Sequence, residues 1–192
     1  MLQRHPIWQY ALKAETLQDF KENVLKPIYI NPSVPDDIQG EIKLVEKLLI
    51  HSFFEYEFID VALTHAAFTL EKALKIKSKE IGAGLNPKLT FEKLIEWFFV
   101  NGYFETDNIE VPNQLRNIRN DKVHRAEKSL GGVIFMGKVY HTLDLINDLY
   151  EDHNLRKDRK SIRKSVNEKL QEFIKEGVIL DTGKERLLVY NA

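Results

Sequence analysis

The densest cluster of chemically useful side chains runs from Gln114 to Arg125. It holds arginine, asparagine, aspartate and histidine within about three helical turns. An arginine fork binds phosphate oxygens bidentately and stabilises negative charge in a transition state, and a histidine near neutral pH can take or give a proton. Arg119 and His124 together therefore suffice for metal-independent cleavage of a phosphodiester that has a neighbouring 2′-hydroxyl.

The spacing within this cluster limits how the two residues can meet. On a regular helix Asn117, Asn120 and His124 share one face, with Asp121 beside them. Arg119 lies about 140° from His124 around such a helix. The two can meet if the helix is irregular, if the long arginine folds round it, or if two copies of the chain supply them to one cleft. The third option predicts a dimer, whereas on spacing alone a solvated helix face is the commoner explanation.

Arg119 to His124 reads R-N-D-K-V-H, which resembles the R-N-x-x-x-H motif of HEPN domains, all-α dimeric modules found in ribonuclease toxins and abortive-infection proteins. The preceding residues 115–118 and the long helix expected after the motif are also typical of that family. The resemblance covers about residues 32–152. It implies a homodimeric endoribonuclease with no cofactor and no metal, in which Arg119 and His124 are the catalytic pair and Asn120 assists them.

The resemblance also implies supporting residues. The family often has an acidic or polar residue on an earlier helix that orients the motif, and Glu71 is the best match. A solvated carboxylate near Lys72 and Lys75 is the alternative explanation for Glu71. Asp121 lies beside the motif and is a second supporting residue.

Two basic stretches can hold an RNA backbone, because screening confines each charge to roughly 10 Å and a local strip can bind phosphates in a chain of net charge −1. One lies in the motif, and the other, residues 156–164, leads into the last predicted helix. A linker or helix start kept soluble by lysine and arginine is the alternative explanation. The candidate RNA-binding residues are Arg116, Lys122, Arg125, Arg156, Arg159 and Lys160.

Composition sets the broad class of the protein. The chain has 192 residues, of which 43% are hydrophobic and 30% charged, so it can bury a core. It has no cysteine, which excludes disulfides, thiolate metal sites and a cysteine nucleophile. Nothing approaches the roughly 20 apolar residues of a membrane span. We expect a cytoplasmic protein with no membrane contact.

Apolar periodicity predicts a mostly helical chain. Residues 53–81 have two apolar stripes, which favours a helix buried on two sides at the centre of a bundle. His65 falls on the first stripe, so we expect a hydrogen-bonded core residue and not a metal ligand. The other predicted helices are a short one within residues 7–30 that stops before Pro27, then one after Asp36-Asp37, one from Thr90 to Gly102, one from Pro112 past His124, one over 133–150 and one over 161–176.

The predicted fold is therefore an antiparallel bundle of four to five helices, HEPN-like by the resemblance, with a C-terminal appendage. Apolar residues 178–180 and 187–190 flank a turn with Asp181 and Gly183, which predicts a β-hairpin. The predicted organisation is an N-terminal helical extension over 1–31, the bundle over 32–153, and a basic helix with the hairpin over 154–192.

Three functions fit these observations. The first is the endoribonuclease, in bacterial defence or a toxin–antitoxin pair, with RNA as substrate and an antitoxin or regulatory protein as partner. The second is an inactive dimer of the same kind that binds RNA, a nucleotide or a protein. The third is an interaction protein that works through its C-terminal helix and hairpin.

Overall fold

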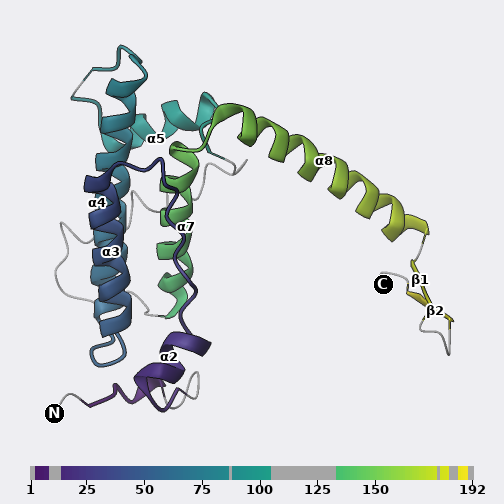
Figure 1. Cartoon of the computed structure of the whole chain (residues 1–192), viewed down its shortest axis with the longest axis horizontal. Helices are drawn as coiled ribbons and strands as arrows, with labels where there is room; N and C mark the ends of the chain where they lie inside the picture. Colours follow the sequence, from purple (N-terminus) through teal and green to yellow (C-terminus); the bar gives the residue numbers. More distant parts are fainter. Residues whose placement is uncertain are drawn as a thin grey trace. The chain divides into compact units, whose positions relative to one another are not determined.

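A computed structural model describes residues 3–8, 14–86, 88–104, 133–176, 178–181 and 186–189 (Figure 1). The chain divides into two compact units, Met1–Glu151 and Asp152–Ala192. The N-terminal segment belongs to the first unit, and the boundary lies within two residues of the predicted end of the bundle. The prediction of a packed helical protein is confirmed.

The first unit is built around one long helix, α4. This helix contacts α3, α5 and α7, so the predicted central position of this segment in the bundle is confirmed. A turn over residues 52–57 joins α3 to α4, and the two helices lie side by side (Figure 1). The described helices of this unit are α2 (Leu17–Asn23), α3 (Asp36–His51), α4 (Phe58–Glu80), α5 (Phe91–Val100) and α7 (Val133–Leu149).

Helix α3 begins where the sequence predicts. Pro35 precedes it, and Asp36 and Asp37 lie in its first turn, where the helix dipole favours negative charge. Its core face is fully buried and consists of Ile38, Ile42, Val45 and Leu49.

Only one of the two apolar stripes of α4 is buried, so the prediction of a helix buried on both stripes is wrong. The other stripe emerges on the surface: Phe58 is half-buried, and Val61 and Phe68 are exposed. The helix packs through one broad arc, which suffices for its contacts with neighbouring helices. The buried stripe contains Ile59, Leu63, Ala66, Leu70 and Ala73.

Helix α5 begins and ends at predicted residues. The hydroxyl of Thr90 accepts a hydrogen bond from the backbone N–H of Lys93, which satisfies one of the unpaired donors of the first turn. Phe91 and Phe98 are among its buried residues. Gly102 follows the helix with φ +73°, a conformation that glycine adopts without strain.

The N-terminal segment is fastened to the bundle by polar contacts. The indole N–H of Trp8, a fully buried residue, donates to the carbonyl of Ser52 at 2.8 Å. Helix α2 starts with a capping box, in which Thr16 and Asp19 bond each other's backbone N–H. It ends at Asn23, before Pro27, as predicted.

Helix α7 returns along α4 and also holds the N-terminal segment. Its side chains Met136, Leu143 and Ile146 are buried, as their spacing predicts. The hydroxyl of Tyr150 donates to the carbonyl of Ala73 on α4 at 3.2 Å, and burial raises the pKa of this phenol. Asn147 bonds two backbone groups of the segment before α3. These contacts join the end of α7 to α4 and to the segment before α3.

The second unit contains a helix and a hairpin. Helix α8 (His153–Glu176) starts eight residues before its predicted start at Ser161, because Asp152 accepts hydrogen bonds from the backbone N–H groups of Asn154 and Leu155 and caps it. Strands β1 (Val178–Asp181) and β2 (Arg186–Val189) pair antiparallel, with Val178 opposite Val189. The predicted hairpin is thus confirmed. Among the described residues, no helix is long and apolar enough to cross a membrane.

Candidate functional site

The predicted catalytic motif lies outside the described residues. Arg119, Asn120 and His124 all belong to the stretch between α5 and α7, so their contacts stay a prediction. The same holds for the predicted helix from Pro112 past His124. The other predicted site residues in this stretch are Asp121, Arg116, Lys122 and Arg125.

Glu71, the predicted supporting residue, lies in the middle of α4. Its carboxylate accepts a hydrogen bond from the Nζ of Lys75 at 2.7 Å, and its side chain is 13% exposed. Lys72, by contrast, pairs with Glu41 on α3. Glu71 is therefore a mostly buried carboxylate of α4, with one of its two neighbouring lysines bound to it.

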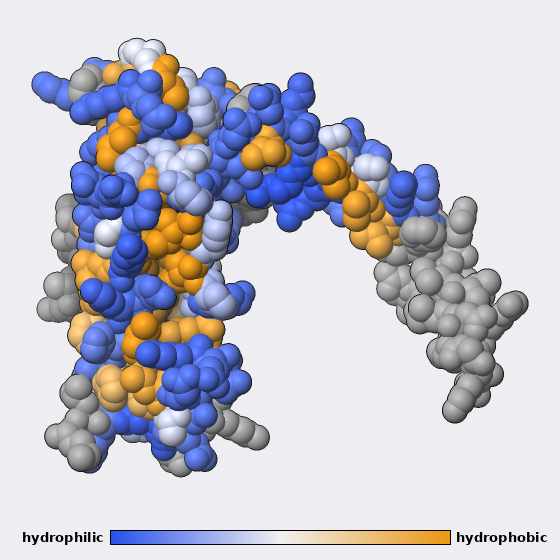
Figure 2. All heavy atoms as spheres, in the orientation of Figure 1, coloured by the Kyte–Doolittle hydropathy of each residue, from blue (hydrophilic) through white to orange (hydrophobic). Residues whose placement is uncertain are grey.

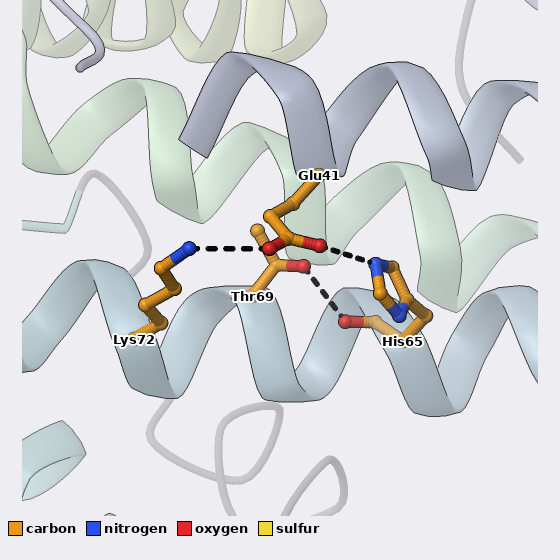
Figure 3. A network of polar contacts seen from close by, with 4 residues as sticks. All are labelled: Glu41, His65, Thr69 and Lys72. Carbon is orange, nitrogen blue, oxygen red and sulfur yellow. Dashed lines mark hydrogen bonds and ion pairs between the residues drawn. The ribbon is translucent and has the colours of Figure 1, made fainter. Parts of the chain in front are cut away.

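A network of polar side chains joins α3 to α4 (Figure 3). The Nε2 of His65 lies 2.8 Å from Oε2 of Glu41, and the Nζ of Lys72 donates to Oε1 of Glu41 at 3.1 Å. The hydroxyl of Thr69 donates to the carbonyl of His65 at 2.8 Å. Both oxygens of one carboxylate are thus held by side chains of the neighbouring helix.

The prediction for His65 is confirmed in part. The side chain is hydrogen-bonded, but it is 28% exposed and lies at the surface between two helices, not in the core. Sequence reasoning missed Glu41 as the partner of His65, and Lys72 as the second side chain bound to Glu41. His65 and Lys72 are seven residues apart and share one helix face, which is a usable signal, but their partner belongs to another helix and its position depends on how the helices pack.

Electrostatics defines what this network can do. The hydrogen bond from Lys72, followed by that from His65, lowers the pKa of Glu41 below its ordinary value. An ionised Glu41 accepts from the imidazole and fixes its orientation, as carboxylates do for catalytic histidines. Within the described parts of the chain, no group of three metal-ligating side chains gathers around it or elsewhere. The network therefore supplies orientation and a salt link between α3 and α4.

Two open hollows lie along α4 and meet at Phe68. One has a volume of about 310 Å³ and runs from Asp60 to His65 and Phe68. The other has a volume of about 450 Å³ and includes Glu71 and three lysines, Lys72, Lys75 and Lys79. His65 of the polar network thus lines one hollow, Glu71 and Lys72 line the other, and Phe68 lines both.

The C-terminal basic stretch is only partly described. Arg159 is exposed, which is compatible with a phosphate contact, and Arg156 is 3% exposed. The side chain of Lys160 lies outside the described residues. Contact of these three residues with RNA stays a prediction.

Comparison of the chain with protein-family models, with curated proteins and with solved structures finds no match.

Proposed function

We propose that the chain is a metal-independent endoribonuclease of the HEPN type, acting as a homodimer in the cytoplasm. The observation that carries the proposal is the spacing from Arg119 to His124, R-N-D-K-V-H, in the stretch between α5 and α7. The packed helical arrangement around α4 supports it, because HEPN modules are helical bundles. The C-terminal helix and hairpin are an appendage to that bundle in this proposal.

The reaction uses the chemistry of two side chains. His124 takes the proton of the ribose 2′-hydroxyl, whose oxygen attacks the adjacent phosphorus, and the bond to the 5′-oxygen breaks. The leaving 5′-oxygen takes a proton from water, and His124 returns its proton to the solvent. The two products carry a 2′,3′-cyclic phosphate and a 5′-hydroxyl. Arg119 binds the phosphate oxygens and stabilises the extra charge of the transition state, and Asn120 fixes the geometry of the pair.

A homodimer explains how Arg119 and His124 can reach the same phosphate. Arg119 and His124 lie about 140° apart on a regular helix, so one helix can direct both at one phosphate only if the helix is irregular or the long arginine folds round it. Two motif helices facing each other across a two-fold axis place both residue types in one cleft. Glu71 is the supporting carboxylate on α4, and its limited exposure fits a positioning role.

The biological setting is the one that the resemblance of Arg119 to His124 to the HEPN motif implies. We place the protein in bacterial defence or in a toxin–antitoxin pair, with an antitoxin or regulatory protein as the partner that restrains it.

The test is an RNA cleavage assay in EDTA that compares the wild-type chain with Arg119→Ala and His124→Ala, with light scattering on each sample. We expect each substitution to reduce cleavage by about a hundredfold or more while the mass stays that of a dimer. Mixing the two variants is expected to restore part of the activity, because a composite cleft can then take its intact residues from different chains. A dimer that binds RNA and never cuts it would replace this proposal with the inactive binding module.

A further inference from the structure

Helix α4 carries three lysines and one aromatic ring on a single face. Lys72, Lys75 and Lys79 lie within about 60° of one another around the helix, because successive residues are about 100° apart. Phe68, one turn before Lys72, falls within the same arc. All four residues line the hollow of about 450 Å³, and they span about 16 Å along the helix. We refer to these four residues as the α4 strip.

The lysines of the α4 strip keep charge available to a ligand. Lys79 is exposed, and no carboxylate pairs with it in the part of the chain that the structure describes. Lys75 binds Glu71 and Lys72 binds Glu41, but the two lysine side chains are 46% and 42% exposed. An ammonium group has three donors and a partly exposed ion pair is weak, so both lysines can also bind a ligand. The described lining of the hollow contains three lysines and one carboxylate and therefore favours an anion.

Phe68 presents an aromatic ring at the beginning of the strip. The residue is 41% exposed and lines both hollows along α4. Apolar side chains also reach the surface elsewhere on this unit, among hydrophilic ones (Figure 2), so exposure by itself does not mark a site. Phe68 differs because three ammonium groups follow it on the same helix face. Single-stranded nucleic acids are bound by this combination, since bases stack on aromatic rings and cations hold the phosphates.

We propose that the α4 strip binds single-stranded RNA, with a base stacked on Phe68 and the phosphates held by the three lysines. The choice of RNA as the ligand rests on the proposed function, in which Glu71 supports the catalytic motif, and Glu71 lines the same hollow as the strip. The strip takes no part in breaking the phosphodiester bond. Its contacts are the same before and during the reaction, so losing one weakens RNA binding and leaves the cleavage rate with saturating RNA unchanged.

The experiment measures the affinity of the full-length chain for a fluorescent single-stranded oligonucleotide by fluorescence anisotropy. The probe is a 2′-O-methyl RNA of mixed sequence and about ten nucleotides, which has no free 2′-hydroxyl and so is not cut by the proposed reaction. Affinities are measured over a range of salt concentrations, because each phosphate contact releases counterions. Thermal unfolding of every variant verifies that it is folded.

The lysines and the ring are tested by different variants. Lys75→Gln and Lys79→Gln are each expected to weaken binding and to reduce the slope of log affinity against log salt concentration by about 0.7, the value for one phosphate contact of a single strand. Lys93→Gln, at an exposed lysine on α5, is the matched control and is expected to change neither quantity. Phe68→Leu keeps an apolar side chain but removes the aromatic face, and it is expected to weaken binding by about fivefold or more, whereas Phe68→Tyr binds like the wild-type chain.

Two results would overturn the proposal. One is a salt slope that is the same for the wild-type chain and both lysine variants, and this readout does not depend on the Phe68 variants being folded. The other is equal affinity of Phe68→Leu and Phe68→Tyr, which would show that no base stacks on the ring and would point to an acidic protein as the partner of the strip. Either result leaves the nuclease assignment intact if natural RNA is cut. Conversely, a chain that binds the probe through the strip but never cuts natural RNA keeps this inference and overturns the proposed function.

Discussion

The Nε2 of His65 on α4 lies 2.8 Å from Oε2 of Glu41 on α3, and Lys72 binds the other oxygen of the same carboxylate. One acidic side chain thus links two positions of α4 that are two helical turns apart. The pairing joins α3 to α4 next to the face that holds the two hollows. Its strength is limited by solvent, because all three side chains are partly exposed.

Glu41→Gln is expected to lower the free energy of unfolding near pH 7 by about 1 kcal/mol or less, because partly exposed ion pairs are screened. The pKa of Glu41 is lowered first by Lys72 and then by His65, so it lies below its ordinary value of 4.5 in the folded chain. The stabilisation is therefore complete above that ordinary value and is lost as the pH falls through the lower folded-state pKa. Urea unfolding of both chains near pH 7 and near pH 3 measures this.

The control is Glu96→Gln, at an exposed glutamate on α5. It is expected to change stability little at either pH. A stability gap between wild type and Glu41→Gln that stays the same in acid would contradict the account of the network.

The two apolar stripes of α4 predict different costs for the same kind of truncation. Leu63 is 1% exposed and Val61, two residues earlier, is 48% exposed. Leu63→Ala is expected to destabilise the fold by about 2–5 kcal/mol, because it leaves a cavity in the core. Val61→Ala is expected to stay within about 0.5 kcal/mol. Equal losses for the two variants in denaturant unfolding would show that both stripes are buried.

Alanine substitutions at two glycines are expected to change the stability of the fold in opposite directions. Gly40 lies inside α3, and a Cβ added there meets no atom within 4 Å, so Gly40→Ala is expected to stabilise the chain by about 0.5–1 kcal/mol. Gly102 has φ +73° after α5, so Gly102→Ala is expected to destabilise it by about 1 kcal/mol. Thermal unfolding ranks the wild-type chain and the two variants. A Gly102→Ala variant that is as stable as the wild-type chain would rule out the assigned turn.

Substitutions at Glu71 and Lys75 distinguish two roles of Glu71, namely positioning the catalytic motif and forming a salt link within α4. If Glu71 orients the motif, Glu71→Gln is expected to reduce RNA cleavage by about tenfold to a hundredfold and to shift its pH profile. Lys75→Ala removes the lysine that binds Glu71 at 2.7 Å and leaves the carboxylate in place. Its cleavage rate is expected to remain near that of the wild type. Parallel losses in the two variants would assign both residues to helix stability.

Local sequence signals predicted much of the fold. Asp36 and Asp37 marked the start of α3, Thr90 capped α5, and Gly102 followed its end. These signals work because caps and positive φ values act within a few residues. The start of α8 at His153, capped by Asp152, depends on the same kind of signal, and it was missed because the polar run that follows lacks an apolar periodicity.

Packing could not be predicted in the same way. The stripe containing Val61 and Phe68 is built from large apolar residues that could equally form a core, and only the arrangement of α3, α5 and α7 around α4 decides which stripe is covered. The link from Glu41 to His65 and Lys72 likewise joins residues that are more than 20 positions apart. For the catalytic motif, the sequence supplied the residues and their spacing, and the prediction of their function awaits an assay.

The central claim is that RNA is cut through its own 2′-hydroxyl by Arg119 and His124. The most direct measurement maps one cleavage site in a short RNA in EDTA, replaces the nucleotide 5′ of the cut by its 2′-deoxy form, and identifies the product ends. We expect a 2′,3′-cyclic phosphate or its hydrolysis product from the RNA, and no cleavage at the deoxy position by wild type or at either substrate by His124→Ala. Cleavage of the deoxy substrate, or a 3′-hydroxyl end, would contradict the account.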